Sequence, residues 1–102
     1  MIHLLTDEPA DAPPPGKFPL GLIVATPGAL AAVPSEQMQA TLRRHHDGGW
    51  GDLCEADRQE NERSLSDGSR LLSVFRTKAG VKFYIITESD RSVTTALLPD
   101  EY

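Results

Sequence analysis

Apolar and polar side chains alternate with a period of two over residues 81–87, the pattern of a β-strand with one wetter face. Apolar runs at 70–76 and 92–98 flank this segment. The connections between them, 77–80 and 88–91, are short and polar, so neighbouring strands must run antiparallel. The last third of the chain is therefore predicted to form a three-stranded antiparallel β-meander.

The residues after the N-terminal region predict a short strand and then a helix. A branched apolar run at 20–25 is bounded by prolines and is typical of a strand. Thr26 and Pro27 follow it and are typical of a helix start, because the threonine oxygen can cap the first turn and proline needs no donor there. A short helix is predicted over 27–32.

A second helix is predicted from residue 35 to residue 45 or 46, with Met38 and Leu42 on one face. It is expected to end at the glycines of 47–49, since glycine adopts the left-handed conformation that closes helices. Trp50 follows directly and is interpreted as an apolar side chain that enters the core from a loop; a ligand platform is the alternative.

The third predicted helix begins at a capping box formed by Asp52 and Glu55, runs to about residue 66, and closes at Asp67-Gly68. Its apolar stripe is thin. One face at helical spacing consists of Cys54, Arg58, Asn61 and Leu65. A polar side chain on an inward face must find hydrogen-bond partners, so Asn61 is expected to bond to whatever the helix packs on.

Together these elements predict an α+β domain, in which a short strand and two to three helices precede the meander. Residues 1–18 contain four prolines, three of them consecutive at 13–15, and are interpreted as a flexible Pro-rich arm. The domain itself is expected to span 19–102. A chain of 102 residues with one cysteine has no internal disulfide, so modest stability or dimerisation is expected.

The net charge of −5 argues against a general nucleic-acid binder, although it does not exclude one. The charge is unevenly divided. Residues 47–67 carry seven acids and two arginines, whereas 70–91 carry five bases and two acids. This division is typical of a solvated acidic helix beside a mixed sheet; a face for an anionic ligand or for a basic protein is the alternative.

Several classes of protein are not indicated. No apolar run approaches the length of a membrane span, and the first residues lack the pattern of a signal peptide, so a cytoplasmic location without membrane contact is expected. Cys54 has no companion at zinc-ligand spacing, and no metal or cofactor is expected. Phosphate-loop, dinucleotide and Gly-x-Ser-x-Gly motifs are missing from the sequence.

Three groups of polar residues are candidates for a site. His45 and His46 end the second predicted helix, where the helix dipole favours a cationic imidazole. Adjacent histidines point about 100° apart, which is unsuitable for a metal pair.

The second group is the polar run 87–95, in which Arg91 stands among Ser92, Thr94 and other hydroxyls. Such a run is often turn chemistry alone. Together with Arg70 or Arg76, however, Arg91 would be able to hold a phosphate through bidentate hydrogen bonds.

The third group is Asn61 with Arg70, Ser73 and Tyr84, which a helix packed on the sheet would bring together. A buried network of this kind can be purely architectural, and this interpretation ranks ahead of catalysis. Across these groups the predicted binding residues are Asn61, Arg70, Ser73, Arg91, Ser92 and Thr94.

The segments 21–30, 49–53, 70–73 and 85–95 together resemble a family of small plasmid-related proteins carried by bacterial mobile elements. The run Ile-Thr-Glu-x-Asp-Arg-Ser-x-Thr-Thr at 86–95 is its most specific part. Some members carry the label of a type I restriction subunit M, but 102 residues cannot house a cofactor-binding methyltransferase domain. The resemblance implies a setting and no reaction.

Two functions from different classes are therefore expected. The first is a non-enzymatic accessory protein of a mobile element that acts through a protein partner or by self-association, with modulation of a host defence system as one role. The alternative is a small metal-independent ribonuclease of the microbial ribonuclease or RelE-like toxin type, by analogy in the order of elements. Its catalytic residues would be His46, Tyr84, Arg91 and Thr94.

Overall fold

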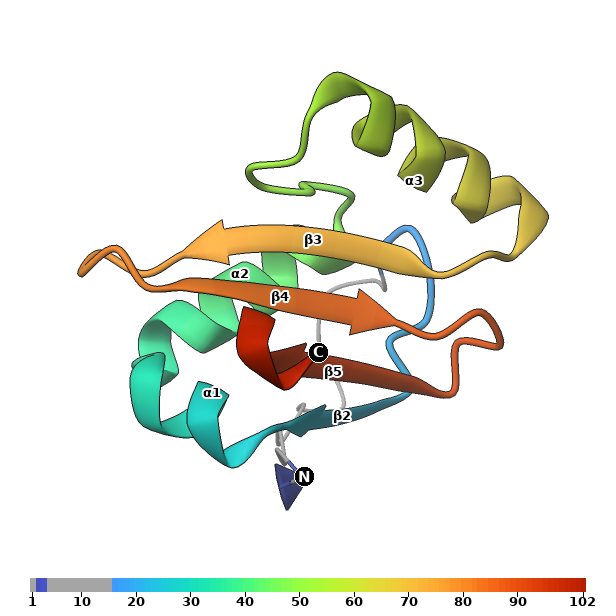
Figure 1. Cartoon of the computed structure of the whole chain (residues 1–102). Coiled ribbons are helices and arrows are strands. Elements are labelled where there is room, and N and C mark those ends of the chain that lie inside the picture. Colours follow the sequence, from blue (N-terminus) through green and yellow to red (C-terminus); the bar gives the residue numbers. More distant parts are fainter. Residues whose placement is uncertain (1, 4–15) are drawn as a thin grey trace.

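The computed structural model describes residues 2–3 and 16–102 and contains one five-stranded sheet in the order β1-β2-β5-β4-β3 (Figure 1). The strands are β1 Ile2–His3, β2 Leu22–Ala25, β3 Leu71–Arg76, β4 Lys82–Thr87 and β5 Val93–Leu97. The helices are α1 Pro27–Ala32, α2 Ser35–His46, α3 Glu55–Asp67 and the 3-10 turn η1 Pro99–Glu101. No helix in this described part is long and apolar enough to cross a membrane.

The α+β class is confirmed, and the sheet is larger and mixed rather than a meander alone. β3, β4 and β5 pair antiparallel as the alternation predicts. β2 joins the other side of β5 in parallel register, with Leu22 opposite Val93 and Ala25 opposite Ala96. A parallel pair needs a long crossover, which the helices and β3–β4 supply, and local pattern gives no information about pairing across such a connection.

The sheet has two distinct faces, because side chains alternate along each strand and cross-strand partners share a face. Helix α2 passes behind the strands in Figure 1, on what we call the covered face, and α1 packs into the same core. Their apolar residues, Ala29, Met38 and Leu42, join the core formed by that face. The sheet contributes to this core the buried side chains Ile23, Ala25, Phe75, Phe83, Ile85 and Ala96.

The opposite side, here called the open face, is covered by neither α1 nor α2, and η1 lies in front of it (Figure 1). By register this side carries Arg76 and Lys82 at its border, and the name open face is used for the other nine positions: Leu22, Val24, Leu72, Val74, Tyr84, Ile86, Val93, Thr95 and Leu97. Its members range from Leu22, which is 50% exposed, to Ile86, which is 5% exposed. Val24, Val74, Ile86 and Leu97 are buried, so only the remaining positions of this apolar face are in contact with solvent.

The first two helices match the predictions in bounds and in caps. The Thr26 hydroxyl oxygen accepts a hydrogen bond from the Ala29 N–H at 3.1 Å, and Pro27 is the first residue of α1. Met38 and Leu42 are buried, as their spacing predicts. Trp50 is 2% exposed and packs with Phe18 and Leu71, which confirms its interpretation as part of the core.

The predicted capping box at the start of the third helix is wrong. Helix α3 begins at Glu55, its N-cap is Cys54, and no side chain caps it. Asp52 instead follows the sheet: its N–H donates to the Val74 carbonyl at 2.7 Å, and its carboxylate pairs with Arg76 at 3.2 Å. The edge of β3 thus holds both the backbone and the carboxylate of Asp52, and the helix starts three residues later.

Two contacts cover the outer edge of β3. Residues 50–52 run beside it, with the Val74 N–H donating to the Trp50 carbonyl at 3.1 Å. Gly51 makes this approach possible, because its φ is +75° and an added Cβ would lie 1.9 Å from the Val74 oxygen. Helix α3 follows along the same edge and supplies the second contact from Asn61 (Figure 1).

The last three residues of the predicted arm, 16–18, contact the folded domain. Phe18 is 6% exposed and belongs to the core with Trp50 and Leu71. The N–H groups of Gly16 and Lys17 donate to the Nε2 and the carbonyl of His46, at 3.0 and 2.8 Å. Ile2–His3 pairs antiparallel with β2, and the rest of the predicted Pro-rich arm, 1 and 4–15, lies outside the described residues.

Candidate functional site

Asn61 is a sheet-edge residue rather than part of a polar cluster. Its amide nitrogen donates to the Leu72 carbonyl at 2.6 Å, and its amide oxygen accepts from the Leu72 N–H at 3.1 Å. The side chain, 4% exposed, thus replaces the peptide group of a missing neighbouring strand. The prediction that Asn61 bonds to the surface under its helix is confirmed, and both of its polar atoms are used in doing so.

Arg91 is held by backbone carbonyls. Its guanidinium donates to the carbonyls of Ser69 at 2.6 Å, Ser64 at 2.9 Å and Glu88 at 3.2 Å. Arg91 also has a φ of +60°, which is uncommon outside glycine. It therefore ties the β4–β5 turn to the C-terminal end of α3, where a cation is favoured by the helix dipole.

A chain of hydrogen bonds, which we call the buried relay, crosses the covered face. Ser73 Oγ lies 2.5 Å from His45 Nδ1, and Thr87 Oγ1 lies 2.8 Å from His45 Nε2. Thr87 Oγ1 lies 2.7 Å from Thr94 Oγ1, which donates to the Leu20 carbonyl at 2.7 Å. The four side chains are all 0% exposed.

The direction of the buried relay follows from its last member, because a carbonyl can only accept. The Thr94 proton is used on Leu20, so the Thr87 hydroxyl must donate to Thr94 and must accept the Nε2–H of His45. His45 Nδ1 is then the unprotonated nitrogen and accepts from Ser73. Every group is satisfied only when His45 is neutral and carries its proton on Nε2.

The pKa of His45 agrees with this assignment. Its pKa is lowered from 6.5 to about 3, chiefly by burial and in addition by the nearby charges of His46 and Arg91. The cationic imidazole expected at the end of α2 is therefore wrong for His45. Phe18 and Trp50 contact its ring edge-to-face, at centroid distances of 5.2 and 5.7 Å, and complete the burial.

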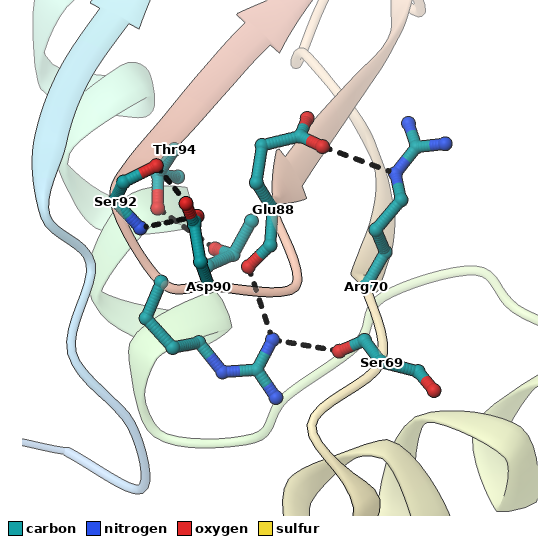
Figure 2. A network of polar contacts seen from close by, with 8 residues as sticks. Ser69, Arg70, Glu88, Asp90, Ser92 and Thr94 are labelled. Atoms are coloured by element: carbon teal, nitrogen blue, oxygen red, sulfur yellow. Dashed lines mark hydrogen bonds and ion pairs between the residues drawn. The ribbon is translucent and has the colours of Figure 1, made fainter.

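The remaining predicted residues point in different directions. Arg70 pairs with Glu88 at 3.5 Å, and Ser92 donates through its N–H and hydroxyl to Asp90 at 3.0 and 2.6 Å (Figure 2). These hydrogen bonds also lower the pKa of Asp90. Tyr84 stands on the open face, and His46 bonds to residues 16 and 17.

The six predicted binding residues consequently do not converge on one cleft. Ser73 and Thr94 meet only through the buried relay. Asn61 lies at the outer edge of β3, and Arg70 lies beside the open face. Within the described residues, no group of three metal-ligating side chains occurs.

Sequence reasoning missed His45 and Thr87 as the centre of the polar network. A signal was available for His45, since it falls three and seven residues after Leu42 and Met38 and thus extends the buried stripe of α2. Thr87 gave a weaker signal, because it continues the inward alternation of Phe83 and Ile85. Both patterns mark these residues as buried polar side chains that need partners, although neither pattern shows that the two meet.

The open face is the remaining candidate for a site. Charged side chains border its apolar residues: Arg70, Arg76, Lys82 and Glu88 occupy positions of the same alternation. An apolar centre with a charged border is the usual composition of a protein interface. Comparison of the chain with family models, curated proteins and solved structures finds no match.

Proposed function

We propose that this is a non-catalytic interaction protein that binds a protein partner, or a second copy of itself, through the open face. The observation that carries this proposal is the composition of that face. Eight of the eleven strand positions on this side of the sheet are apolar, although α1 and α2 pack on the other side. The other three are Thr95, Arg76 and Lys82. Strands with apolar residues on both faces are typical of sheets that are covered on both sides.

The use of the candidate polar groups supports the same proposal. Thr94 and Ser73 are fully buried, and the guanidinium of Arg91 is bonded to three carbonyls. Groups that are already satisfied within the fold must give up those bonds before they can bind a substrate, which is costly for buried polar atoms. These polar groups stabilise the fold. The exposed apolar side chains of the open face, such as Leu22, are therefore the surface that remains for a partner.

The biological setting of this proposal comes from the resemblance at 86–95 and the other matching segments. The resemblance supports a role as an accessory protein of a mobile element. Modulation of a host defence system is a role compatible with a small, acidic, non-catalytic protein. The cytoplasm is the compartment in which such a partner would be met.

The ribonuclease alternative receives no support from a specific observation. Tyr84 and Thr94 lie on opposite faces of the sheet, because Tyr84 pairs with Leu97 and Thr94 pairs with Thr87. General acid–base catalysis needs its groups within hydrogen-bond reach of one phosphate. Incubation with single- and double-stranded RNA should leave the RNA intact, and cleavage that Arg91→Ala abolishes would revive the alternative.

The proposal is tested by quantitative capture with matched variants. Immobilised protein should retain a partner at one-to-one stoichiometry from a host extract, or should form dimers by light scattering. Leu22→Glu, which places a charge on the open face, should lose this binding, whereas Arg43→Glu on the exposed side of α2 should keep it. Equal binding by both variants, or a monomer without partner, would contradict the proposal.

A further inference from the structure

Two tyrosines and two cations form a cluster on the open face, which we call the tyrosine site. The rings of Tyr84 and Tyr102 meet edge-to-face with centroids 5.9 Å apart. The Arg70 guanidinium lies 5.8 Å from the centre of the Tyr102 ring, and the Lys82 ammonium lies 5.8 Å from the centre of the Tyr84 ring. The tyrosine rings can stack with a further aromatic side chain, and the two cations can pair with a carboxylate.

The segment that occupies the tyrosine site belongs to the chain itself. Residues 99–102 carry two acids followed by Tyr102. Glu101 anchors the segment, since its carboxylate accepts from the Thr26 hydroxyl at 2.5 Å and from the Leu98 N–H at 2.9 Å. These hydrogen bonds also lower the pKa of Glu101.

Tyr102 is held far less firmly than Glu101. Its side chain is 66% exposed, the highest value among the large apolar residues of the described chain. Its described contacts are the ring of Tyr84 and the guanidinium of Arg70, interactions that are weak when exposed. A competing aromatic side chain is therefore able to displace it without breaking the Glu101 anchor.

The charge around the tyrosine site selects an acidic competitor. Arg70 and Arg76 border the open face there and pair with Glu88 at 3.5 Å and with Asp52 at 3.2 Å. Both ion pairs are exposed and therefore weak, so a ligand carboxylate can replace Glu88 on Arg70. Lys82 has no carboxylate partner among the described ion pairs. A ligand that brings carboxylates beside an aromatic ring is complementary to this arrangement.

We propose that the tyrosine site binds an acidic peptide segment with an aromatic side chain, supplied by a partner protein, and that residues 99–102 occupy the same site in the free protein. This inference rests on the proposed interaction function and names the chemistry of the partner. The partner's ring replaces Tyr102 between Tyr84 and Arg70, and its carboxylates meet Arg70 and Lys82.

The test uses a labelled peptide with the sequence of residues 96–102, ALLPDEY, and measures its fluorescence anisotropy with the full chain. Tyr102→Ala empties the ring position, so it should bind the peptide at least fivefold more tightly than the wild type. A second substitution, Arg70→Gln, should then weaken binding at least tenfold. The matched control Arg43→Gln in the same Tyr102→Ala background should not change it.

Three outcomes would overturn the inference: no binding by Tyr102→Ala at millimolar peptide, equal loss with Arg70→Gln and Arg43→Gln, or equal binding of a peptide with lysines in place of its two acids. Dimerisation of the wild type that Tyr102→Ala abolishes would also overturn it, because the occupant would then be a second copy. Thermal unfolding of each variant shows that it is folded. If the capture experiment still gives a partner that Leu22→Glu loses, the interaction function stands and only the peptide chemistry fails.

Discussion

The two faces of the sheet differ in where they place polar and apolar side chains. The covered face places a histidine, a serine and two threonines inside the core, and each is satisfied by the next. The open face turns apolar side chains such as Leu22 and Tyr84 toward solvent. Buried polar groups whose hydrogen bonds are all satisfied need no role beyond stabilising the fold. Apolar side chains left partly exposed on one face do not stabilise it and point to a binding surface.

The comparison teaches that residue type alone does not locate function in this protein. A histidine flanked by hydroxyl groups is the usual sign of a catalytic site. Here the same groups lie under α2 and the rings of Phe18 and Trp50, where no substrate can approach. The role of such a histidine depends on whether it is buried and whether its hydrogen bonds are satisfied. Neither property can be read directly from the sequence.

The largest expected effect comes from breaking the buried relay at its centre. His45→Ala leaves a cavity and removes the partners of Ser73 and Thr87, so it should lower the free energy of unfolding by about 3–5 kcal/mol. Urea denaturation measures the change. A loss below about 1 kcal/mol would show that the relay contributes little.

A matched pair of substitutions compares the two faces directly. Thr87→Val removes the acceptor of His45 and the donor to Thr94, and should cost about 2–3 kcal/mol. Thr95→Val, the same change on the open face, should alter stability by less than about 0.5 kcal/mol. Equal effects in urea denaturation would remove the distinction between the faces.

The neutral state of His45 predicts a pH dependence of stability. The pKa of His45 is about 3 in the folded protein and 6.5 when unfolded, so between these values the unfolded chain binds the extra proton. Stability contributed by His45 is complete above pH 6.5 and falls as the pH drops toward 3, by roughly 2 kcal/mol between pH 7 and 5. His45→Gln should lose this part of the slope; an unchanged slope would mean that another group is responsible.

A smaller effect than those of His45 and Thr87 is expected at Arg91, which connects α3 to the β4–β5 turn. Arg91→Ala loses three hydrogen bonds to carbonyls on a partly exposed side chain and should cost about 1–2 kcal/mol. Arg91→Gly loses the same bonds but relieves the φ of +60°, so it should be more stable than Arg91→Ala. The reverse order in thermal unfolding would show that the turn is not strained.

Most of the local structure follows from the sequence, and most of the long-range structure does not. The meander, α1 and α2 form where periodicity and caps place them, because these signals act within a few residues. The parallel pairing of β2 with β5 and the use of Asp52 at the sheet edge depend on contacts between distant segments. For the same reason, Asn61 was identifiable as inward-facing but its partner Leu72 was not.

The candidate site shows the same limit. Tyr84, Arg70 and Lys82 stand at alternate-strand positions that pattern can assign to one face. Their meeting with Tyr102 depends on the path of η1 over the sheet, which no periodicity encodes. Arg91 and Thr94 are close in sequence, yet the turn sends Arg91 to α3 and Thr94 into the core.

The contrast between the faces is tested most directly by side-chain NMR during titration of Tyr102→Ala with the 96–102 peptide. The ring resonances of Tyr84 should shift, while the imidazole signals of His45 should remain those of a neutral ring protonated on Nε2. Shifts at His45 or His46 without a shift at Tyr84 would contradict the account, because the binding surface would then lie on the covered side of the sheet.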